Sequence, residues 1–165
     1  MTAGATGPGG SGPGGSGAGT GGTALPARGP ALRLLPRIEP ENEFFWTGGA
    51  DGRLRFLRCG ACRAYVHPPS PRCPDCLSSE LAPEEVSGRA TVVAHTINVQ
   101  EWIPGSGPYL IGLVAIEEDE RVRLTTNLVD VAAAEVRTGM AVEVVFDHHD
   151  DVYLPLFRPA TGDRA

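Results

Sequence analysis

The stretch CGACRAYVHPPSPRCPDC, residues 59–76, contains all four cysteines of this 165-residue chain. They form two C-x2-C pairs, Cys59 with Cys62 and Cys73 with Cys76, separated by ten residues. Each pair places two thiolates on one tight turn, and two such turns supply the four ligands of a tetrahedral metal site. The spacing therefore predicts a structural zinc site. Because the protein supplies all four ligands, no coordination position is left open for a catalytic water.

Two other uses of paired cysteines fit the sequence less well. Disulfide bonds need an oxidising compartment, and the N-terminus has neither the basic nor the apolar region of a secretory signal. A redox-active C-x-x-C motif normally occurs once rather than twice. The ligand set does not distinguish zinc from iron, because a rubredoxin-like iron site uses the same four thiolates.

The residues around the cysteines indicate a small β-structure. Residues 53–58 alternate arginine with apolar side chains and lead into the first pair, as expected for a strand. Residues 64–72 carry three prolines, which favour extended backbone and remove hydrogen-bond donors. We therefore predict a rubredoxin-like zinc ribbon over residues 53–82.

The N-terminal part divides into a tail and a short helical segment. Residues 1–30 include 12 glycines and almost no large apolar side chains, so we predict a disordered tail over residues 1–35. Residues 36–52 contain acidic residues followed by the aromatic triplet Phe44, Phe45 and Trp46, which indicates one or two helical turns. Three adjacent aromatic residues cannot share one face of so short a helix. We expect them either to fold onto their own domain or to contact a partner protein.

Residues 83–160 have the pattern of a small antiparallel barrel. We predict strands at 86–99, 109–116, 121–127, 141–146 and 152–157, with a bend or bulge at Gly88 in the long first strand. Residues 129–136 contain helix formers, with Asp130 as the expected N-cap. Three strands, a helix and two strands is the order of the five-stranded Greek-key OB barrel. We predict a C-terminal tail over residues 161–165. The fold class is thus mainly β, with a short N-terminal helix.

Charge and hydropathy limit the classes of function. The net charge is −6, and residues 41–165 carry 11 arginines against 19 acidic residues. Nucleic-acid-binding proteins usually have the opposite charge balance, because phosphate neutralisation supplies most of their affinity. No apolar run approaches a membrane span, so we expect a cytoplasmic protein without a membrane partner. The chain has no lysine, which excludes Schiff-base chemistry.

No catalytic constellation is evident in the sequence. We expect His95 to lie in a barrel strand with its hydrogen bonds satisfied, and His148 and His149 to lie in a solvated acidic turn. There is no G-x-S-x-G nucleophile elbow, and no glycine-rich phosphate loop follows a strand. The sequence therefore predicts a protein that is not an enzyme by itself.

A zinc ribbon followed directly by this barrel resembles the DUF35-type zinc-ribbon and OB-fold proteins of bacteria and archaea. The resemblance covers residues 38–160. Segments that carry it, in the expected order, include Phe45-Trp46, the two cysteine pairs, Ser87-Gly88-Arg89-Ala90-Thr91-Val92, Leu124-Thr125-Thr126-Asn127-Leu128, Gly139-Met140-Ala141-Val142 and Leu156-Phe157-Arg158-Pro159.

The resemblance implies a role as the accessory partner of a thiolase-fold enzyme, either a thiolase or a lipid-transfer-type aldolase. Such enzymes act on acyl-CoA thioesters, including those of lipid and steroid side-chain metabolism. Some relatives are fused to an enoyl-CoA hydratase domain, which this chain lacks. Thiolase-fold enzymes are dimeric, so the resemblance implies a heterotetramer of two copies of each subunit.

Contacts with the partner or with a CoA thioester would use residues in and around the ribbon. Arginine suits phosphate recognition because its planar guanidinium donates two parallel hydrogen bonds. The candidates for contact with acyl-CoA or the partner are Arg55, Arg58, Arg63, Tyr65, His67 and Arg72, and those for the partner interface are Phe44, Phe45, Trp46 and Trp102. Two alternatives stay open: a single-stranded nucleic-acid-binding OB module, and a free-standing acyl-CoA-binding protein.

Overall fold

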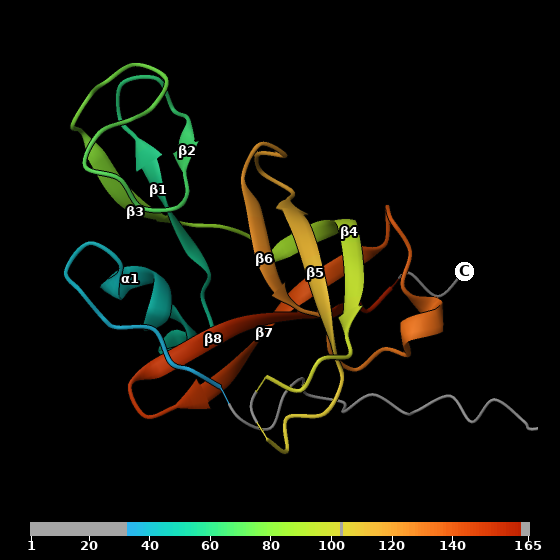
Figure 1. The fold of residues 1–165 in the computed structure, drawn as a ribbon. Helices are drawn as coiled ribbons and strands as arrows, with labels where there is room; N and C mark the ends of the chain where they lie inside the picture. The colour runs from blue at the N-terminus through green and yellow to red at the C-terminus, as the bar shows by residue number, and fades with distance from the viewer. Residues whose placement is uncertain (1–32, 103, 163–165) are drawn as a thin grey trace, which may run out of the picture.

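The computed structural model describes residues 33–102 and 104–162. The predicted tails lie largely outside these ranges. No helix in the described part is long and apolar enough to cross a membrane. In chain order the elements are α1 (Glu43–Trp46), the 3-10 turn η1 (Gly48–Asp51), β1 (Arg55–Cys59), β2 (Tyr65–Val66), β3 (Leu81–Glu85), β4 (Arg89–Asn98), β5 (Tyr109–Ile116), β6 (Arg123–Asn127), the 3-10 turn η2 (Ala133–Glu135), β7 (Ala141–His149) and β8 (Val152–Pro159) (Figure 1).

The predicted ribbon is present as a three-stranded antiparallel sheet in the order β2-β1-β3. Strand β1 pairs Arg58 with Tyr65 of β2 and Cys59 with Leu81 of β3. The sheet extends to Glu85, beyond the boundary expected at residue 82. Pro83 lies within β3, which the structure tolerates because β3 is an edge strand.

The second sheet has the predicted OB topology, with the strand order β6-β5-β4-β7-β8. A parallel bridge between Leu128 and Phe157 brings the end of β6 against β8 and closes the barrel. The Thr126 hydroxyl donates a hydrogen bond of 2.7 Å to the Pro155 carbonyl across the same seam. Closure removes most free strand edges, which an open five-stranded sheet would expose.

The long first barrel strand has two irregularities, of which the sequence predicted the first, at Gly88. Gly88 has a φ of +73°, a conformation that favours glycine, and it precedes β4 directly. A register shift between Val92 and Ala94 then marks a bulge within β4 that the sequence did not locate. Together these features allow β4 to pair with β7 at its start and with β5 along its length.

The helix expected over residues 129–136 is mostly absent. Only Ala133–Glu135 form a 3-10 turn, and Ala132 occupies the N-cap position. Asp130 has a φ of +54° and so is not the cap that we expected. The connection still fills the barrel, because Val129 and Val136 are buried. Strand β7 also runs further than predicted, to His149, so His148 and His149 lie at the end of a strand and not in the turn that we expected.

Ribbon, helix and barrel share one hydrophobic core. Phe45 of α1 and Phe56 of β1 belong to the same cluster of buried side chains as Val92, Val114 and Phe157 of the barrel. Figure 1 shows α1 between the ribbon and the β7–β8 hairpin. The ribbon is therefore packed against the barrel through apolar contact and is not a module on a flexible linker.

Turn η1 packs closely on the β7–β8 hairpin at Gly49. A Cβ atom at this position would lie 2.6 Å from Cδ1 of Phe146 and would also overlap Cβ of Tyr153. We expect Gly49→Ala to destabilise the chain by about 2 kcal/mol, since overpacking that forces backbone shifts costs of this order. Urea unfolding measures this change. Gly60→Ala is the matched control, because its Cβ would meet Glu80 at ordinary contact distances of 3.4 Å or more; equal stability of both variants would contradict the packing argument.

Candidate metal centre

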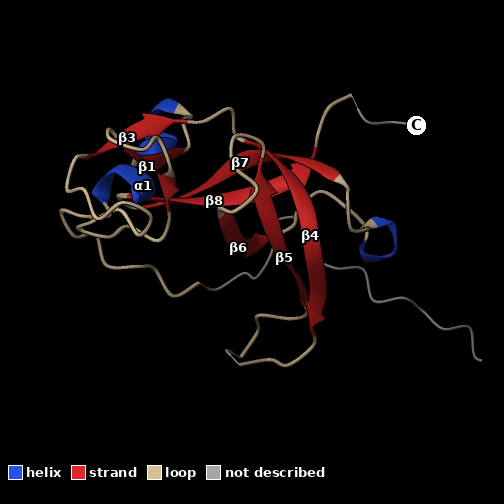
Figure 2. Ribbon diagram, turned by 90° about the horizontal axis from the view of Figure 1, so that it is seen from above, coloured by secondary structure: helices blue, strands red, loops and turns tan. Residues whose placement is uncertain are grey.

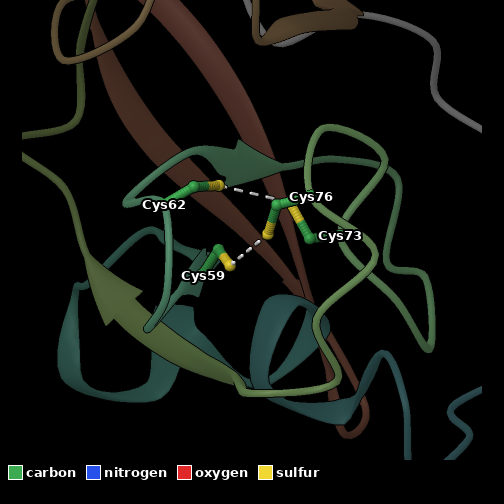
Figure 3. A group of neighbouring side chains, drawn as sticks. All are labelled: Cys59, Cys62, Cys73 and Cys76. Carbon is green, nitrogen blue, oxygen red and sulfur yellow. Dashed lines mark hydrogen bonds between the residues drawn. The ribbon is translucent and has the colours of Figure 1, made fainter.

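The four cysteine side chains converge from the two turns onto one point (Figure 3). Their sulfur atoms all lie within 4.8 Å of one another, and the pairs Cys59–Cys76 and Cys62–Cys73 are each separated by 3.6 Å. A tetrahedral zinc with bonds of about 2.3 Å requires sulfur–sulfur separations of about 3.8 Å, so the cluster fits the ion. Disulfide bonds are not formed, because bonded sulfurs lie about 2.05 Å apart.

Backbone N–H groups around the cluster favour thiolate ligands. The N–H groups of Cys62 and Ala61 lower the pKa of Cys59 to about 6. Those of Ala64 and Ser78 act in the same direction on Cys62 and Cys76, but the pKa of each of these two thiols is raised. Burial is the largest cause for Cys62, followed by hydrogen bonds with the Cys73 and Cys59 sulfurs, whereas for Cys76 the hydrogen bond with the Cys62 sulfur is the largest cause, followed by burial and hydrogen bonds with the Cys59 and Cys73 sulfurs. A divalent cation offsets this rise in pKa, since its charge is shared by all four thiolates.

The ribbon has little else to hold it together. Its own cluster contains Leu57, Ala64 and Val66 with the buried sulfurs of Cys59 and Cys73. So small an apolar core does not offset the conformational entropy of about 30 ordered residues, and a structural metal supplies the difference in such modules. The metal centre is thus a structural element, with four protein ligands and no open position.

The arginines predicted to form a basic contact surface are instead engaged within the chain. Arg55 binds Asp51 through both terminal nitrogens, at 2.5 and 3.2 Å, and lowers the pKa of that carboxyl. Arg63 lies 3.3 Å from Glu84. Arg72 donates a hydrogen bond to the Leu77 carbonyl, and Arg58 stacks 3.9 Å above the Tyr65 ring. The structure therefore offsets much of the positive charge that the sequence suggests.

Tyr65 and His67, also candidates for ligand contact, pack inside the molecule. Tyr65 is 8% exposed, and its hydroxyl donates a hydrogen bond to Glu84. The His67 ring lies 5.0 Å from Phe45 and 4.9 Å from Phe56. Burial lowers the pKa of His67 to about 4, so the imidazole is neutral near pH 7. Both side chains join the ribbon to the core.

The aromatic candidates for a partner interface differ in how far they are buried. Phe45 is buried, with only 3% of its surface exposed, and so offers no surface to a partner. Phe44 and Trp46 are half-buried against the core. Trp102 lies in the β4–β5 loop with 76% of its surface exposed. Of this set, Trp102 presents the largest fraction of its surface to solvent.

Sequence reasoning missed Arg33, which we assigned to the tail. Its side chain is 9% exposed and donates hydrogen bonds to Asp147 at 3.0 Å and to Asn127 at 2.8 Å. Asp147 also lies 3.1 Å from His149. These contacts tie the start of the described chain to the barrel. Among the described residues, the four cysteines are the one group of His, Cys, Asp or Glu side chains whose ligand atoms lie close enough together to hold a metal.

Comparison with family models matches both parts of this architecture. Residues 46–82 match the rubredoxin-like zinc ribbon domain of ChsH2, and residues 83–147 match its C-terminal OB-fold domain. A solved structure described as the Ltp2-ChsH2(DUF35) aldolase contains a chain with 33% sequence identity and a TM-score of 0.69, covering 77% of this chain and 100% of that one. The chain belongs to the DUF35 family.

Other DUF35-related proteins differ in length and description. A probable enoyl-CoA hydratase alpha subunit from Thermomonospora curvata is 36% identical over 132 residues, which are 79% of this chain but 41% of that protein. A DUF35 domain-containing scaffold protein from Methanocaldococcus jannaschii is 32% identical over 95 residues, covering 54% of this chain and 64% of that protein. The chain thus spans less than two thirds of either curated relative. A DUF35 protein from Sulfolobus solfataricus shares the fold, with a TM-score of 0.54 at 18% identity over 73% of this chain and 86% of that one.

The metal centre makes a direct prediction about Cys73. We expect the purified chain to contain one zinc ion, and Cys73→Ser to lose most of the metal and to unfold at a lower temperature, because one of four ligands and a buried sulfur are lost. Metal analysis after growth with both zinc and iron, combined with thermal unfolding, measures both effects. Ser70→Ala, in the segment between the two pairs, is the control. Iron as the main metal, or full metal retention by Cys73→Ser, would contradict the assignment.

The packed imidazole of His67 predicts a pH dependence of stability. Its pKa is lowered from an ordinary value of 6.5 to about 4, so the unfolded chain binds more protons than the folded one between these pH values. Stability from this group is complete above pH 6.5 and decreases toward pH 4, by at most about 1.4 kcal/mol per pH unit. Urea unfolding at pH 7 and pH 5 tests this, with His67→Gln as the comparison. The same pH slope in both proteins would exclude His67 as its source.

Proposed function

We propose that this chain is a non-catalytic accessory subunit that binds and stabilises a thiolase-fold enzyme acting on acyl-CoA thioesters. The observation that carries the proposal is that the chain matches the full length of a chain from the Ltp2-ChsH2(DUF35) aldolase. The described residues therefore correspond to a complete component of that aldolase structure. The hydratase description of the longer relative does not transfer, because more than half of that protein lies outside the match.

The side chains of the described residues support a role without chemistry of its own. The metal centre is closed, and His67 is packed between two aromatic rings. The His148 ring stacks on Tyr153 at 4.2 Å, and Nε2 of His149 lies 3.1 Å from an oxygen of Asp147. We infer that the nucleophile and the base for C–C bond cleavage or formation come from the partner enzyme.

A contact with CoA would be shared with the partner. Arg58 and Arg63 line a shallow hollow of about 370 Å³ on the ribbon, together with Glu80 and Glu84. The two carboxylates offset the two guanidinium groups, which weakens phosphate binding by the hollow alone. We propose that this face contributes to the acyl-CoA site only when the partner supplies a second wall and further donors. From the family resemblance, we propose an acyl group of lipid or steroid side-chain type as the substrate.

The two alternatives have less support. A free-standing acyl-CoA carrier needs an internal cavity, but Val92, Val114 and Phe157 fill the barrel with fully buried side chains. A nucleic-acid-binding surface needs free positive charge, whereas Arg55, Arg63 and Arg121 are each paired with a carboxylate in a chain of net charge −6.

Recovery of the partner from the native host tests the proposal. We expect the tagged chain to co-purify with a thiolase-fold polypeptide in equal amounts, in a complex whose mass corresponds to two copies of each. We expect that polypeptide to be unstable or inactive toward acyl-CoA thioesters alone, and active after this chain is added, because its substrate site is then complete. Light scattering and a C–C bond cleavage assay measure these outcomes.

Controls separate an accessory role from general stabilisation. The metal-depleted Cys73→Ser variant is expected to restore less activity than the unaltered chain, whereas Ser70→Ala restores it fully. Full activity of the thiolase-fold enzyme without this chain would overturn the proposal. Salt-sensitive binding of a single-stranded oligonucleotide, with no enzyme recovered, would favour the nucleic-acid alternative.

A further inference from the structure

The distal half of β4 is less covered than the rest of the barrel. Strand β7 pairs with β4 only from Arg89 to Thr91. From Ala94 to Asn98, β5 is the one strand that pairs with β4 among the described residues, so the other edge of this segment has no partner strand there. Unpaired backbone N–H and C=O groups of this kind readily accept another polypeptide.

Side chains on this segment are exposed on both faces of the sheet. Consecutive residues from Ala94 to Ile97 are all exposed, whereas the first half of β4 alternates exposed and buried residues. His95 lies in a barrel strand, as expected, but its side chain is exposed. Figure 2 shows the β4–β5 loop extending away from the ribbon and from α1. The distal part of β4 thus projects from the barrel, whereas Leu110 of β5, which pairs with Ile97, is buried in the core.

Large apolar side chains gather at this end of the hairpin. Ile97 is 42% exposed, Val99 is 80% exposed and Trp102 is 76% exposed. They account for three of the six large hydrophobic side chains that are exposed in the described part of the chain. Exposed apolar groups concentrated in six residues indicate an interaction surface, and tryptophan is enriched among residues that dominate binding energy.

The same hairpin is nearly free of charge. Between Arg89 and Glu117, Glu101 is the single Asp, Glu, Lys or Arg residue. In the whole chain, 34 of 165 residues are of these four types. Native edge strands are normally protected by charged residues or proline, and the edge from Ala94 to Asn98 has neither. Depletion of charge is the property that marks the centre of a protein–protein interface.

We propose that the distal β4 edge with Ile97, Val99 and Trp102, here named the β4 edge surface, is where this chain docks on a neutral, apolar surface of its thiolase-fold partner. This inference rests on the proposed function. A second copy of the chain is a poorer occupant, because each copy has a net charge of −6 and repels another.

Substitutions on the β4 edge surface test the assignment with the complex itself. The unaltered chain and its variants are titrated against the purified thiolase-fold subunit that co-purifies from the host. We expect Trp102→Ser to raise the dissociation constant of the complex by about 30-fold, as the loss of a central aromatic contact does. We expect Ile97→Lys also to raise it strongly, because the substitution places a charge on the strand edge. Hydrogen exchange of the amides from Ala94 to Asn98 is expected to slow in the complex.

Leu77→Asn is the matched control. Leu77 is 68% exposed on the ribbon, and asparagine tolerates its φ of +63°. We expect this variant to bind the partner within about twofold of the unaltered chain. Thermal unfolding of each variant alone checks that the exposed substitutions leave the fold intact.

The outcomes distinguish this inference from the proposed function. If the complex forms but Trp102→Ser and Ile97→Lys bind as tightly as the unaltered chain, the assignment of the β4 edge surface as the docking site is wrong and the accessory role stands. If the unaltered chain binds no thiolase-fold subunit, the docking site and the accessory role are both wrong. If the chain alone is a dimer by light scattering that Trp102→Ser dissociates, a second copy occupies the surface and the inference is overturned.

Discussion

Four sulfur atoms within 4.8 Å of one another are the constraint on which the N-terminal half of this molecule depends. The ribbon has only three other residues in its buried cluster, so apolar burial alone does not fix its two turns. Once the metal joins the two turns, β1 is held in place. Phe56, on the other face of β1, then packs in the core cluster that it shares with the barrel. The metal centre therefore acts through packing, because it positions the apolar face that the ribbon presents to the rest of the chain.

That packing explains why the ribbon and the barrel behave as one body although family models treat them as two domains. Strand β3 belongs to the ribbon sheet yet runs past the family boundary at residue 82. The Val86 N–H then donates a hydrogen bond to the Leu54 carbonyl, immediately before the barrel begins. The salt bridge between Arg121 and Asp75 joins the two parts again, but an exposed pair of this kind adds little stability.

Features with a short-range signature could be predicted from the sequence. Cysteine spacing identified the metal ligands, and alternating apolar residues identified the barrel strands and their order. Features that depend on distant partners could not: Arg33 binds Asp147, 114 residues away, and follows the glycine-rich N-terminal residues in a segment without periodicity. The pairing of Arg55 and Arg63 with acidic residues was missed for a related reason, since a sequence shows each charge but not which charges meet. Strand β3 was not predicted from the sequence. It contains Pro83, and proline argues against a strand unless the strand lies at an edge.

The arrangement of charge and burial separates what stabilises this chain from what remains available to other molecules. Its arginines near the ribbon are largely engaged with carboxylates, and its barrel interior is filled. Because buried side chains such as Val92, Val114 and Phe157 fill the barrel, we infer that the function of this chain depends on its surface. Exposed backbone edges and apolar side chains raise the risk of aggregation, and selection normally removes them when they serve no purpose. Their concentration on one nearly uncharged hairpin is therefore best explained by a partner that covers it.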